Sequence, residues 1–298
     1  MTDRVLIPMP GNAELGDRLA KAVGIDTGSV EVRRFPDGET YVRLDGALTG
    51  LSIVLVCSLD RPDDKLLPLL FAASTARELG AASVGLVAPY LAYMRQDRRF
   101  RPGEAVTSSY FAQVLSRHFD WLVTVDPHLH RRNSLSEIYS VPAVALHAAP
   151  LLSEWIAREI ANPVLIGPDS ESDQWVAAVA RGAGAPYVVL EKTRRGDREV
   201  EISIPEMARW MRHTPVLVDD IVSTGRTMIE TMHHLKAAAT KPPVCVVIHG
   251  VFVGNAYAEL RAAGAQRIVS ANTIPHESNG IDVTSLLAQA IRDIASAG

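Results

Sequence analysis

The residues with the clearest chemical potential lie in one stretch, Pro215–Met228, whose sequence is PVLVDDIVSTGRTM. An apolar run typical of a buried strand, Val216–Val218, leads directly into two adjacent carboxylates, Asp219 and Asp220. A short loop with hydroxyl groups and one glycine follows, and the next residues, Met228–Ala239, are compatible with a helix. Backbone N–H groups at a helix start suit a phosphate, and paired carboxylates suit ribose hydroxyls or a magnesium ion. The stretch therefore predicts a site for a sugar phosphate.

Two simpler interpretations explain less of this stretch. The loop has one glycine and no lysine, so it is not the nucleotide loop G-x-x-x-x-G-K-[ST]. A buried strand that ends in a polar turn and a capped helix would account for the apolar run. It would leave the two neighbouring acids unexplained.

Five other segments carry side chains that suit phosphate, nucleotide or metal chemistry, and each also has a structural interpretation. They are the turn Phe-Pro-Asp-Gly-Glu at 35–39, the stretch Pro89–Pro102 with its four arginines, Asp126 with His128, Asp169, and Lys192 with Arg194. The structural alternative is a hairpin turn for 35–39 and a solvated basic turn for the arginine stretch. It is a structural histidine for His128 and a capped helix start at 170–173 for the segment after Asp169. For Lys192 and Arg194 it is a solvated basic loop. Asp126 and His128 are two positions apart, so on a strand they would share a face. We expect residues 193–199, the most polar run, to form an exposed loop.

The elements that must position these residues follow an α/β pattern. Short β-branched runs alternate with helical patterns along almost all of the 298 residues, which is typical of a mainly parallel sheet. Ligands of such sheets gather beyond the carboxyl ends of the strands.

A weak repeat relates Val54–Val56 to Val216–Val218, each followed by a helix and another strand. Two similar halves of about 150 residues would explain it. The first-half loop, Ser58–Asp64, lacks Thr-Gly-x-Thr, so we expect only the second half to hold a phosphate.

Composition narrows the class of protein and of partner. A net charge of −4 and a pI near 6.1 provide no general basic surface, so we expect no nucleic-acid partner and only a local anion site. The two cysteines lie in apolar runs, as buried reduced thiols do, and the first residues are not those of a secretory signal. The longest apolar stretch, Pro243–Val253, is too short to cross a bilayer. We expect a cytoplasmic protein with no membrane partner.

Taken in order, these segments resemble the ribose-phosphate diphosphokinases, which make phosphoribosyl pyrophosphate (PRPP). The resemblance extends over nearly the whole chain. The matching segments are 35–39 to the family's Phe-Ser-Asp-Gly-Glu, Arg95–Arg98 to its Arg-Gln-Asp-Arg/Lys loop, Asp126–His128 to its Asp-Leu-His, Pro168–Asp169 to its pyrophosphate-side loop, Lys192 and Arg194 to its flexible catalytic loop, and Asp219–Thr227 to its ribose-5-phosphate loop.

The resemblance implies two phosphoribosyltransferase-type domains, 1–146 with a degenerate phosphate loop and 147–298 with the ribose-5-phosphate loop, each a mainly parallel sheet flanked by helices. It implies transfer of the β,γ-diphosphoryl group of ATP to the anomeric hydroxyl of ribose 5-phosphate, with Mg²⁺ as cofactor. The implied roles are catalysis for Lys192 and Arg194; ribose 5-phosphate binding for Asp219, Asp220, Ser223, Thr224, Gly225, Arg226 and Thr227; ATP binding for Phe35, Asp37, Glu39, Arg95, Gln96, Asp97 and His128; and metal binding for His128 and Asp169. In this family the 35–39 segment reaches ATP across a subunit contact, which implies a homo-oligomer.

The chain also departs from the family pattern. Ser170-Glu171-Ser172 replaces a Gly-Gly pair, and Arg226 replaces the second glycine of Thr-Gly-Gly-Thr. Ser223 and the C-terminal segment 272–283 are similar to archaeal-type members. Two alternatives remain: a phosphoribosyltransferase that consumes PRPP, which leaves 35–39 and 95–98 unexplained, and a non-catalytic regulator, which the changes at 170–172 suggest.

Overall fold

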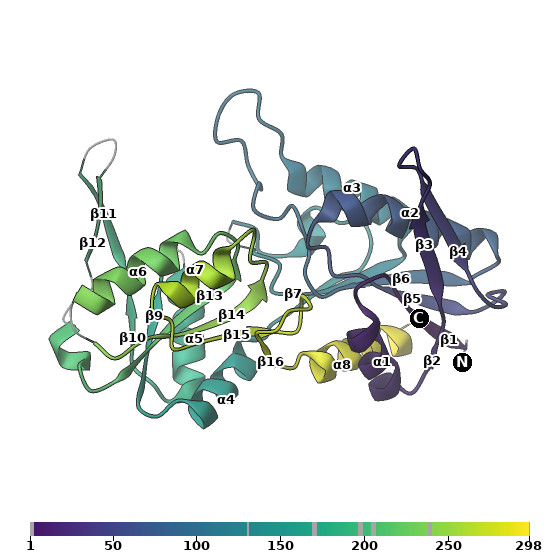
Figure 1. Cartoon of the computed structure of the whole chain (residues 1–298). Helices are drawn as coiled ribbons and strands as arrows, with labels where there is room; N and C mark the ends of the chain where they lie inside the picture. Colours follow the sequence, from purple (N-terminus) through teal and green to yellow (C-terminus); the bar gives the residue numbers. More distant parts are fainter. Residues whose placement is uncertain are drawn as a thin grey trace. The chain divides into compact units, whose positions relative to one another are not determined.

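The computed structural model describes residues 3–129, 131–168, 172–195, 199–203, 207–237 and 240–297. It has two six-stranded parallel sheets with helices on both faces (Figure 1), so the predicted α/β class is confirmed. Contacts divide the chain into two compact units. The first comprises Met1–Leu146, Thr273–Pro275 and Val283–Gly298, and the second comprises His147–Asn272 and His276–Asp282.

The sheet of the first unit has the order β2-β1-β5-β6-β7-β8, and each neighbouring pair is parallel. Its strands are β1 (Arg4–Pro8), β2 (Asp26–Thr27), β5 (Ser52–Val56), β6 (Ser83–Ala88), β7 (Trp121–Val125) and β8 (Ala143–Leu146). A separate antiparallel hairpin consists of β3 (Val30–Arg34) and β4 (Thr40–Leu44). The helices are α1 (Ala13–Val23), α2 (Pro62–Glu78), α3 (Thr107–His118), the 3₁₀ turn η1 (Leu135–Glu137) and α8 (Thr284–Ala297).

The last helix changes the expected domain division. The sequence assigns 147–298 to a second domain, but α8 packs with α1 and contacts β7 and β8 in the first unit. The guanidinium of Arg292 also donates to the carbonyl oxygen of Ala22 at the end of α1. Alternation of strands and helices along the chain could not reveal this return, because α8 has the same amphipathic pattern as the helices before it.

The second unit repeats the arrangement with the order β10-β9-β13-β14-β15-β16, again all parallel. Its strands are β9 (Pro163–Gly167), β10 (Tyr187–Val189), β13 (Thr214–Val222), β14 (Val244–Gly250), β15 (Arg267–Ala271) and β16 (Asn279–Ile281). Its helices are α4 (Ala149–Glu159), α5 (Asp173–Ala183), the 3₁₀ turn η3 (Met207–Trp210), α6 (Arg226–Ala237) and α7 (Ala256–Ala262). Helices α4 and α5 pack together, as do α6 and α7, and Figure 1 shows the two pairs on opposite faces of this sheet.

The polar run at 193–199, predicted as an exposed loop, lies partly in strands, and its residues 196–198 are outside the described part of the chain. Residues Glu191–Arg195 form β11 and Glu199–Ser203 form β12, which pair antiparallel in a two-stranded sheet of their own. Main-chain hydrogen bonds define such a pair whatever the side chains are, so a polar composition did not exclude it. In the described part of the chain no helix is both long and apolar enough to span a membrane.

The β-branched runs form the interior of each sheet because helices cover both faces. In β13 the four residues Pro215–Val218 are buried, and Leu217 packs in a cluster with Met232 and Leu235 of α6. Cys57 and Cys245 are both buried and free of disulfides, as their apolar surroundings predict. Burial raises the pKa of each thiol to about 12.

The two sheets match strand for strand, which supports the internal repeat. In each order the second and third positions are β1 and β5 in the first unit and β9 and β13 in the second. The pairing of Val54–Val56 with Val216–Val218, made from the sequence, therefore equates the third strand of both sheets. The loops after β5 and β13 occupy equivalent positions at the carboxyl edges of their sheets.

Candidate active site

Strand β13 carries both predicted carboxylates to the edge of its sheet. The sequence predicts a strand over 216–218, but the ladder continues through the acids, with Asp219 opposite Val247 and Val222 opposite Gly250 of β14. Both aspartates are half-buried. The Asp219 carboxylate accepts a hydrogen bond of 2.9 Å from the backbone N–H of Asp220. The sheet thus holds the backbone of both acids in a fixed register.

The loop after β13 leads directly into α6. Gly225 has a φ of +68°, a left-handed conformation that glycine adopts without steric cost, and α6 begins at the next residue, Arg226. The N–H of Ile229 donates to the carbonyl oxygen of Gly225, so the amides before it at the helix start have no acceptor inside the helix. These amides and the positive end of the helix dipole suit an anion. The side chains of Thr224 and Arg226 are exposed at this point.

The segment after β14 supports this loop through its main chain. The N–H groups of Val251 and Phe252 donate to the carbonyl oxygen of Val222 over 3.0 and 3.1 Å, and that of Val253 donates to Ser223 over 3.0 Å. Phe252 has a φ of +41°, which is unusual for a bulky residue. The beginning of the loop after β13 therefore rests on a strained turn that no sequence motif indicated.

Three rings, including that of Phe252, pack against one another at this turn. The Phe252 ring lies 5.3 Å from that of Tyr257 and 4.7 Å from the imidazole of His276, and these last two are 4.7 Å apart. Burial lowers the pKa of His276, and the backbone N–H of Ser278 donates to its Nδ1. Sequence pattern gave no signal for this cluster, because its members come from three separate segments.

In the first unit, residues 35–39 form the turn between β3 and β4, so the hairpin interpretation is confirmed. The N–H of Phe35 donates to the carbonyl oxygen of Glu39, and the Asp37 carboxylate accepts from the Glu39 N–H. Gly38 supplies the left-handed position with a φ of +92°. The Phe35 ring is 40% exposed, with the Arg33 guanidinium 4.8 Å from its centre. The turn presents an aromatic face and two acids at the surface.

The loop after β6 contains the predicted ATP-binding residues Arg95, Gln96 and Asp97. Arg95 is exposed, whereas the Gln96 side chain accepts a 3.2 Å hydrogen bond from the Thr107 hydroxyl at the start of α3. The Asp97 carboxylate is only 7% exposed, and its Oδ1 lies 3.3 Å from Nη1 of Arg131. The structure therefore places Arg95 at the surface and directs Asp97 toward another part of the same unit.

Asp126 and His128 follow β7, but they do not share a strand face as the sequence predicts. The strand ends at Val125, and both residues have positive φ angles, 34° and 54°. The N–H of His128 donates to the carbonyl oxygen of Asp126, so the segment is a tight turn. Asp126 is buried and His128 is half-buried. The two-residue alternation of a strand does not apply beyond the last strand residue.

Two predicted groups lie partly or wholly outside the described residues. Asp169, with Ser170 and Glu171, is outside them. Ser172 occupies the N-cap position of α5, so the predicted helix start is confirmed, but its side chain makes no capping hydrogen bond. The backbone of Lys192 and Arg194 lies in β11, and their side chains are outside the described part. Among the described residues, no group of three His, Cys, Asp or Glu side chains is placed to hold a metal ion.

Comparison with known proteins identifies the family. A sequence model for the N-terminal domain of ribose phosphate pyrophosphokinase matches residues 5–118, and one for the phosphoribosyl transferase domain matches 134–286. A ribose-phosphate pyrophosphokinase of Methanopyrus kandleri is 35% identical over 294 residues, which cover 98% of this chain and 99% of that protein. The chain belongs to the ribose-phosphate pyrophosphokinase family.

Other members of the ribose-phosphate pyrophosphokinase family agree with this assignment. The Methanosarcina acetivorans protein of that name is 32% identical, with 96% of this chain and 99% of that protein aligned. The crystal structure of phosphoribosylpyrophosphate synthetase from Mycobacterium smegmatis has the same fold, with a TM-score of 0.86 at 24% identity over 99% of this chain and 100% of that one. The resemblance drawn from the sequence motifs is confirmed, and the protein is an enzyme of this family.

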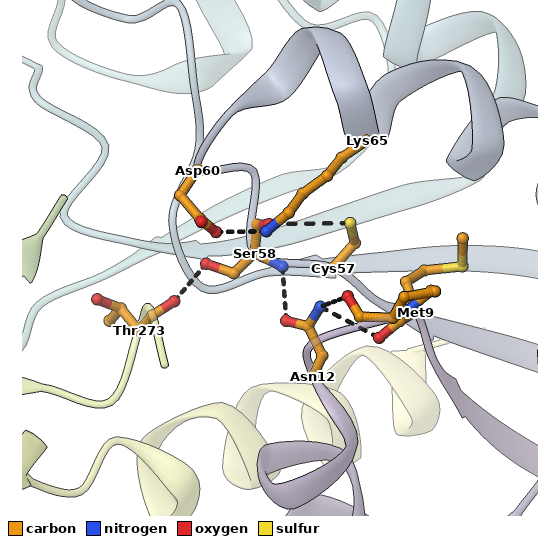
Figure 2. Close-up of polar contacts among 8 residues, drawn as sticks. Met9, Asn12, Cys57, Ser58, Asp60, Lys65 and Thr273 are labelled. Carbon is orange, nitrogen blue, oxygen red and sulfur yellow. Dashed lines mark hydrogen bonds and ion pairs between the residues drawn. The ribbon is translucent and has the colours of Figure 1, made fainter. Parts of the chain in front are cut away.

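The loop after β5 (Figure 2) lies at the position in the first sheet that is equivalent to the loop after β13 in the second. Arg61, with a φ of +57°, precedes α2 as Gly225 precedes α6. Figure 2 shows that the Lys65 ammonium points back into this loop, where it donates to the Ser58 carbonyl oxygen over 2.9 Å and to Asp60 over 2.5 Å. A cation from the chain itself thus occupies this loop.

Three further hydrogen bonds fix the loop after β5. The Asn12 side chain accepts from the backbone N–H of Ser58 and donates to the carbonyl oxygen of Met9. The Ser58 hydroxyl donates to the carbonyl oxygen of Thr273, which is fully buried in the same unit. These contacts connect the carboxyl ends of β1 and β5 with the returning chain. The loop after β5 is thereby closed by protein groups.

Proposed function

We propose that this protein transfers the β,γ-diphosphoryl group of ATP to the anomeric hydroxyl of ribose 5-phosphate, giving PRPP and AMP. The anomeric oxygen forms a bond to the β-phosphorus. The bond from that phosphorus to the oxygen shared with the α-phosphate breaks, so AMP leaves with this oxygen and the hydroxyl proton is released. Membership of the ribose-phosphate pyrophosphokinase family supports the reaction.

One observation carries the proposal: β13 carries two carboxylates near its carboxyl end, and a glycine turn and a helix start follow that end. The amides and hydroxyls of Ser223–Thr227 bind the 5-phosphate, and Asp219 and Asp220 bind the ribose hydroxyls, directly or through a metal. The arrangement supports this division, because the carboxylates and the amides lie on either side of one short loop. Arg226, exposed in the first turn of α6, adds a cation near the phosphate.

ATP binding involves the first unit. Arg95 and Gln96 contact the nucleotide from the loop after β6, and His128 does so from the turn after β7. The exposed Phe35 ring, with Asp37 and Glu39, meets adenine in the site of a neighbouring subunit. Exposure of an aromatic side chain at a hairpin tip supports contact with a partner.

Mg²⁺ fits the donor chemistry at the carboxyl ends of both sheets. Mg²⁺ typically takes one or two carboxylates and completes its coordination with water and substrate phosphates, so a closed cluster of protein ligands is not required. His128 and Asp169 would assist in holding it on the polyphosphate, and Asp219 and Asp220 would do so at the ribose. When bound, it neutralises charge on the phosphoryl oxygens.

Lys192 and Arg194 would stabilise charge on the transferring group. Both belong to β11, whose residues 192 and 194 pair with Ile202 and Val200 of β12. Positioning and electrostatic stabilisation supply most of the acceleration in such reactions.

Incubation with ribose 5-phosphate and MgATP, followed by separation of the nucleotides, tests the reaction. PRPP and AMP in equal amounts are the expected products. ADP without AMP would indicate an ordinary kinase, and no turnover would indicate a non-catalytic regulator. Release of pyrophosphate from PRPP only when a nucleobase is present would indicate a phosphoribosyltransferase.

The subunit contact has a separate test. Phe35→Ala and Lys192→Ala variants, each of low activity, would be mixed under conditions that allow subunits to exchange. A shared site predicts recovered activity, because some mixed sites receive an intact residue from each subunit. Mixtures that only average the two activities would contradict the shared site.

A further inference from the structure

We propose that Arg131 and Arg132 are positioning residues for ATP, which act by joining the loop after β6 to the turn after β7. The inference rests on the proposed function, because it concerns the ATP half of that reaction. All of its members belong to the first unit. Neither arginine belongs to the motifs that the sequence analysis singled out.

Asp97 is held by these two consecutive arginines in different ways. Nη1 of Arg131 lies 3.3 Å from one carboxylate oxygen and 3.5 Å from the other. Nη2 of Arg132 donates to the backbone carbonyl oxygen of Asp97 over 3.2 Å. Both the side chain and the main chain of Asp97 are thus attached to the segment that follows His128. A carboxylate so little exposed depends on such partners, because burial of an unpaired charge is costly.

The same guanidinium extends the connection to α3. Nη2 of Arg132 lies 3.3 Å from the Ser108 hydroxyl and 3.2 Å from that of Ser109 in the first turn of this helix. The backbone N–H of Ser108 also donates to the carbonyl oxygen of Gln96. Arg132 is only 16% exposed, so solvent weakens these contacts little. Residues 96 and 97 are therefore held from two sides, by α3 and by the segment after β7.

This geometry couples two proposed ATP contacts that come from different strands. Arg95 directly precedes the anchored pair Gln96–Asp97, and His128 lies three residues before Arg131. Displacement of the loop after β6 would move Arg95 relative to His128. Small misplacements of binding groups reduce transition-state stabilisation strongly.

Charge adds a second effect of the same pair. If Arg131 is removed, the Asp97 carboxylate remains shielded from solvent without its cation, close in sequence to groups that contact a polyanion. Like charges repel most where solvent is excluded. Loss of Arg131 should therefore be partly reversed by neutralising Asp97. An arginine that binds ATP directly would show no such reversal.

The experiment is a double-mutant cycle with Arg131→Met and Asp97→Asn, measured by initial rates and by calorimetric titration with MgATP. We expect Arg131→Met to raise the KM for ATP and the Kd for MgATP about 10-fold, with the KM for ribose 5-phosphate changed less than about twofold. Adding Asp97→Asn should return both ATP constants to within about threefold of wild type. The ATP constants of Arg131→Lys, which keeps the positive charge, should lie between those of wild type and those of Arg131→Met.

Arg77→Met is the matched control. Arg77 forms an ion pair of 2.9 Å with Asp120, and its side chain is 39% exposed, which is comparable to Arg131. The Arg77–Asp120 pair lies at the amino end of β7. Arg77→Met should leave both KM values unchanged. Thermal unfolding of every variant reports whether the fold is retained.

Two results would overturn the inference: ATP constants of Arg131→Met within twofold of wild type, or a loss that Asp97→Asn does not reverse. If wild type binds MgATP but makes no PRPP, the proposed reaction fails while the cycle on MgATP binding still decides the role of Arg131. A wild-type protein that binds no ATP would overturn both.

Discussion

The backbone N–H of Val253 donates to the carbonyl oxygen of Ser223, so the first residue of the loop between β13 and α6 is fixed by the chain after β14. On its far side the loop lies against α7, because a Cβ at Gly225 would come within 3.2 Å of the Leu260 side chain. The loop is thus held at its first residue and limited in space at its glycine. Its shape is set before any ligand binds, which lowers the entropy lost on binding.

Gly225→Ala tests this fixed shape. Alanine at a φ of +68° is strained by about 1–2 kcal/mol, and its methyl group must also displace Leu260. We expect the KM for ribose 5-phosphate to rise about 10-fold or more, while the KM for ATP changes little. Gly184→Ala is the control, since Gly184 has a φ of +62° with open space around the added methyl group. It should lower the melting temperature through the same backbone strain and leave both KM values intact. Equal kinetic effects of the two variants would show that strain alone is responsible.

The two ways of removing the Asp219 charge should differ. Asp219→Asn keeps a side-chain oxygen that can accept from the Asp220 N–H, whereas Asp219→Ala leaves that amide without this partner. A hydrogen bond of this kind contributes about 0.5–1.5 kcal/mol. We therefore expect kcat/KM for ribose 5-phosphate to be about 3–10-fold lower in Asp219→Ala than in Asp219→Asn. Identical values would mean that the charge is the whole contribution of Asp219.

Lys192→Ala should lower kcat by about 100-fold or more, the scale of losing one preorganised charge contact, with a smaller effect on either KM. Steady-state rates with both substrates varied provide the measurement. Lys236→Ala, at an exposed position near the end of α6, controls for loss of a positive charge in the same unit. A kcat within threefold of wild type would remove Lys192 from the catalytic role.

His276 should make stability depend on pH. Burial lowers its pKa in the folded protein below the usual value near 6.5, so the unfolded chain binds a proton more readily. The contribution of His276 to the free energy of unfolding is therefore fully present above pH 6.5. It is lost as the pH falls through the folded-state pKa. Urea unfolding at pH 7.5 and pH 5.5 measures the difference in the free energy of unfolding between the two pH values. This difference should be smaller in His276→Gln than in wild type. Substitution of the exposed His233 should leave it unchanged. A difference that is the same in wild type and His276→Gln would exclude His276 as its source.

The sequence predicted the elements that depend on side-chain pattern and missed those that depend on backbone pairing. Val216–Val218 was visible because three apolar residues are buried between helices. The continuation of β13 through Asp219–Val222 was not visible, because these residues remain in the sheet through hydrogen bonds with β14. The same cause explains why polar residues of β11 and β12 were assigned to a loop.

For the candidate site, local motifs were accessible and long-range partners were not. The acids, glycine and helix start of 219–227 are neighbours in sequence, so their types and order sufficed. Asp97 and Arg131 are 34 positions apart, and the turn at Phe252 requires a φ that its side chain does not favour. No single-sequence pattern contains such information, because it arises from tertiary packing that overrides local preference.

The return of α8 to the first unit has a consequence for biogenesis. Protein synthesis proceeds from the N-terminus, so every strand of both sheets has been made before the helix that packs on α1 is available. Until then the side of α1 that α8 covers remains exposed on the nascent chain. Synthesis of α8, rather than completion of residue 146, is therefore the step after which the first unit can reach its native state.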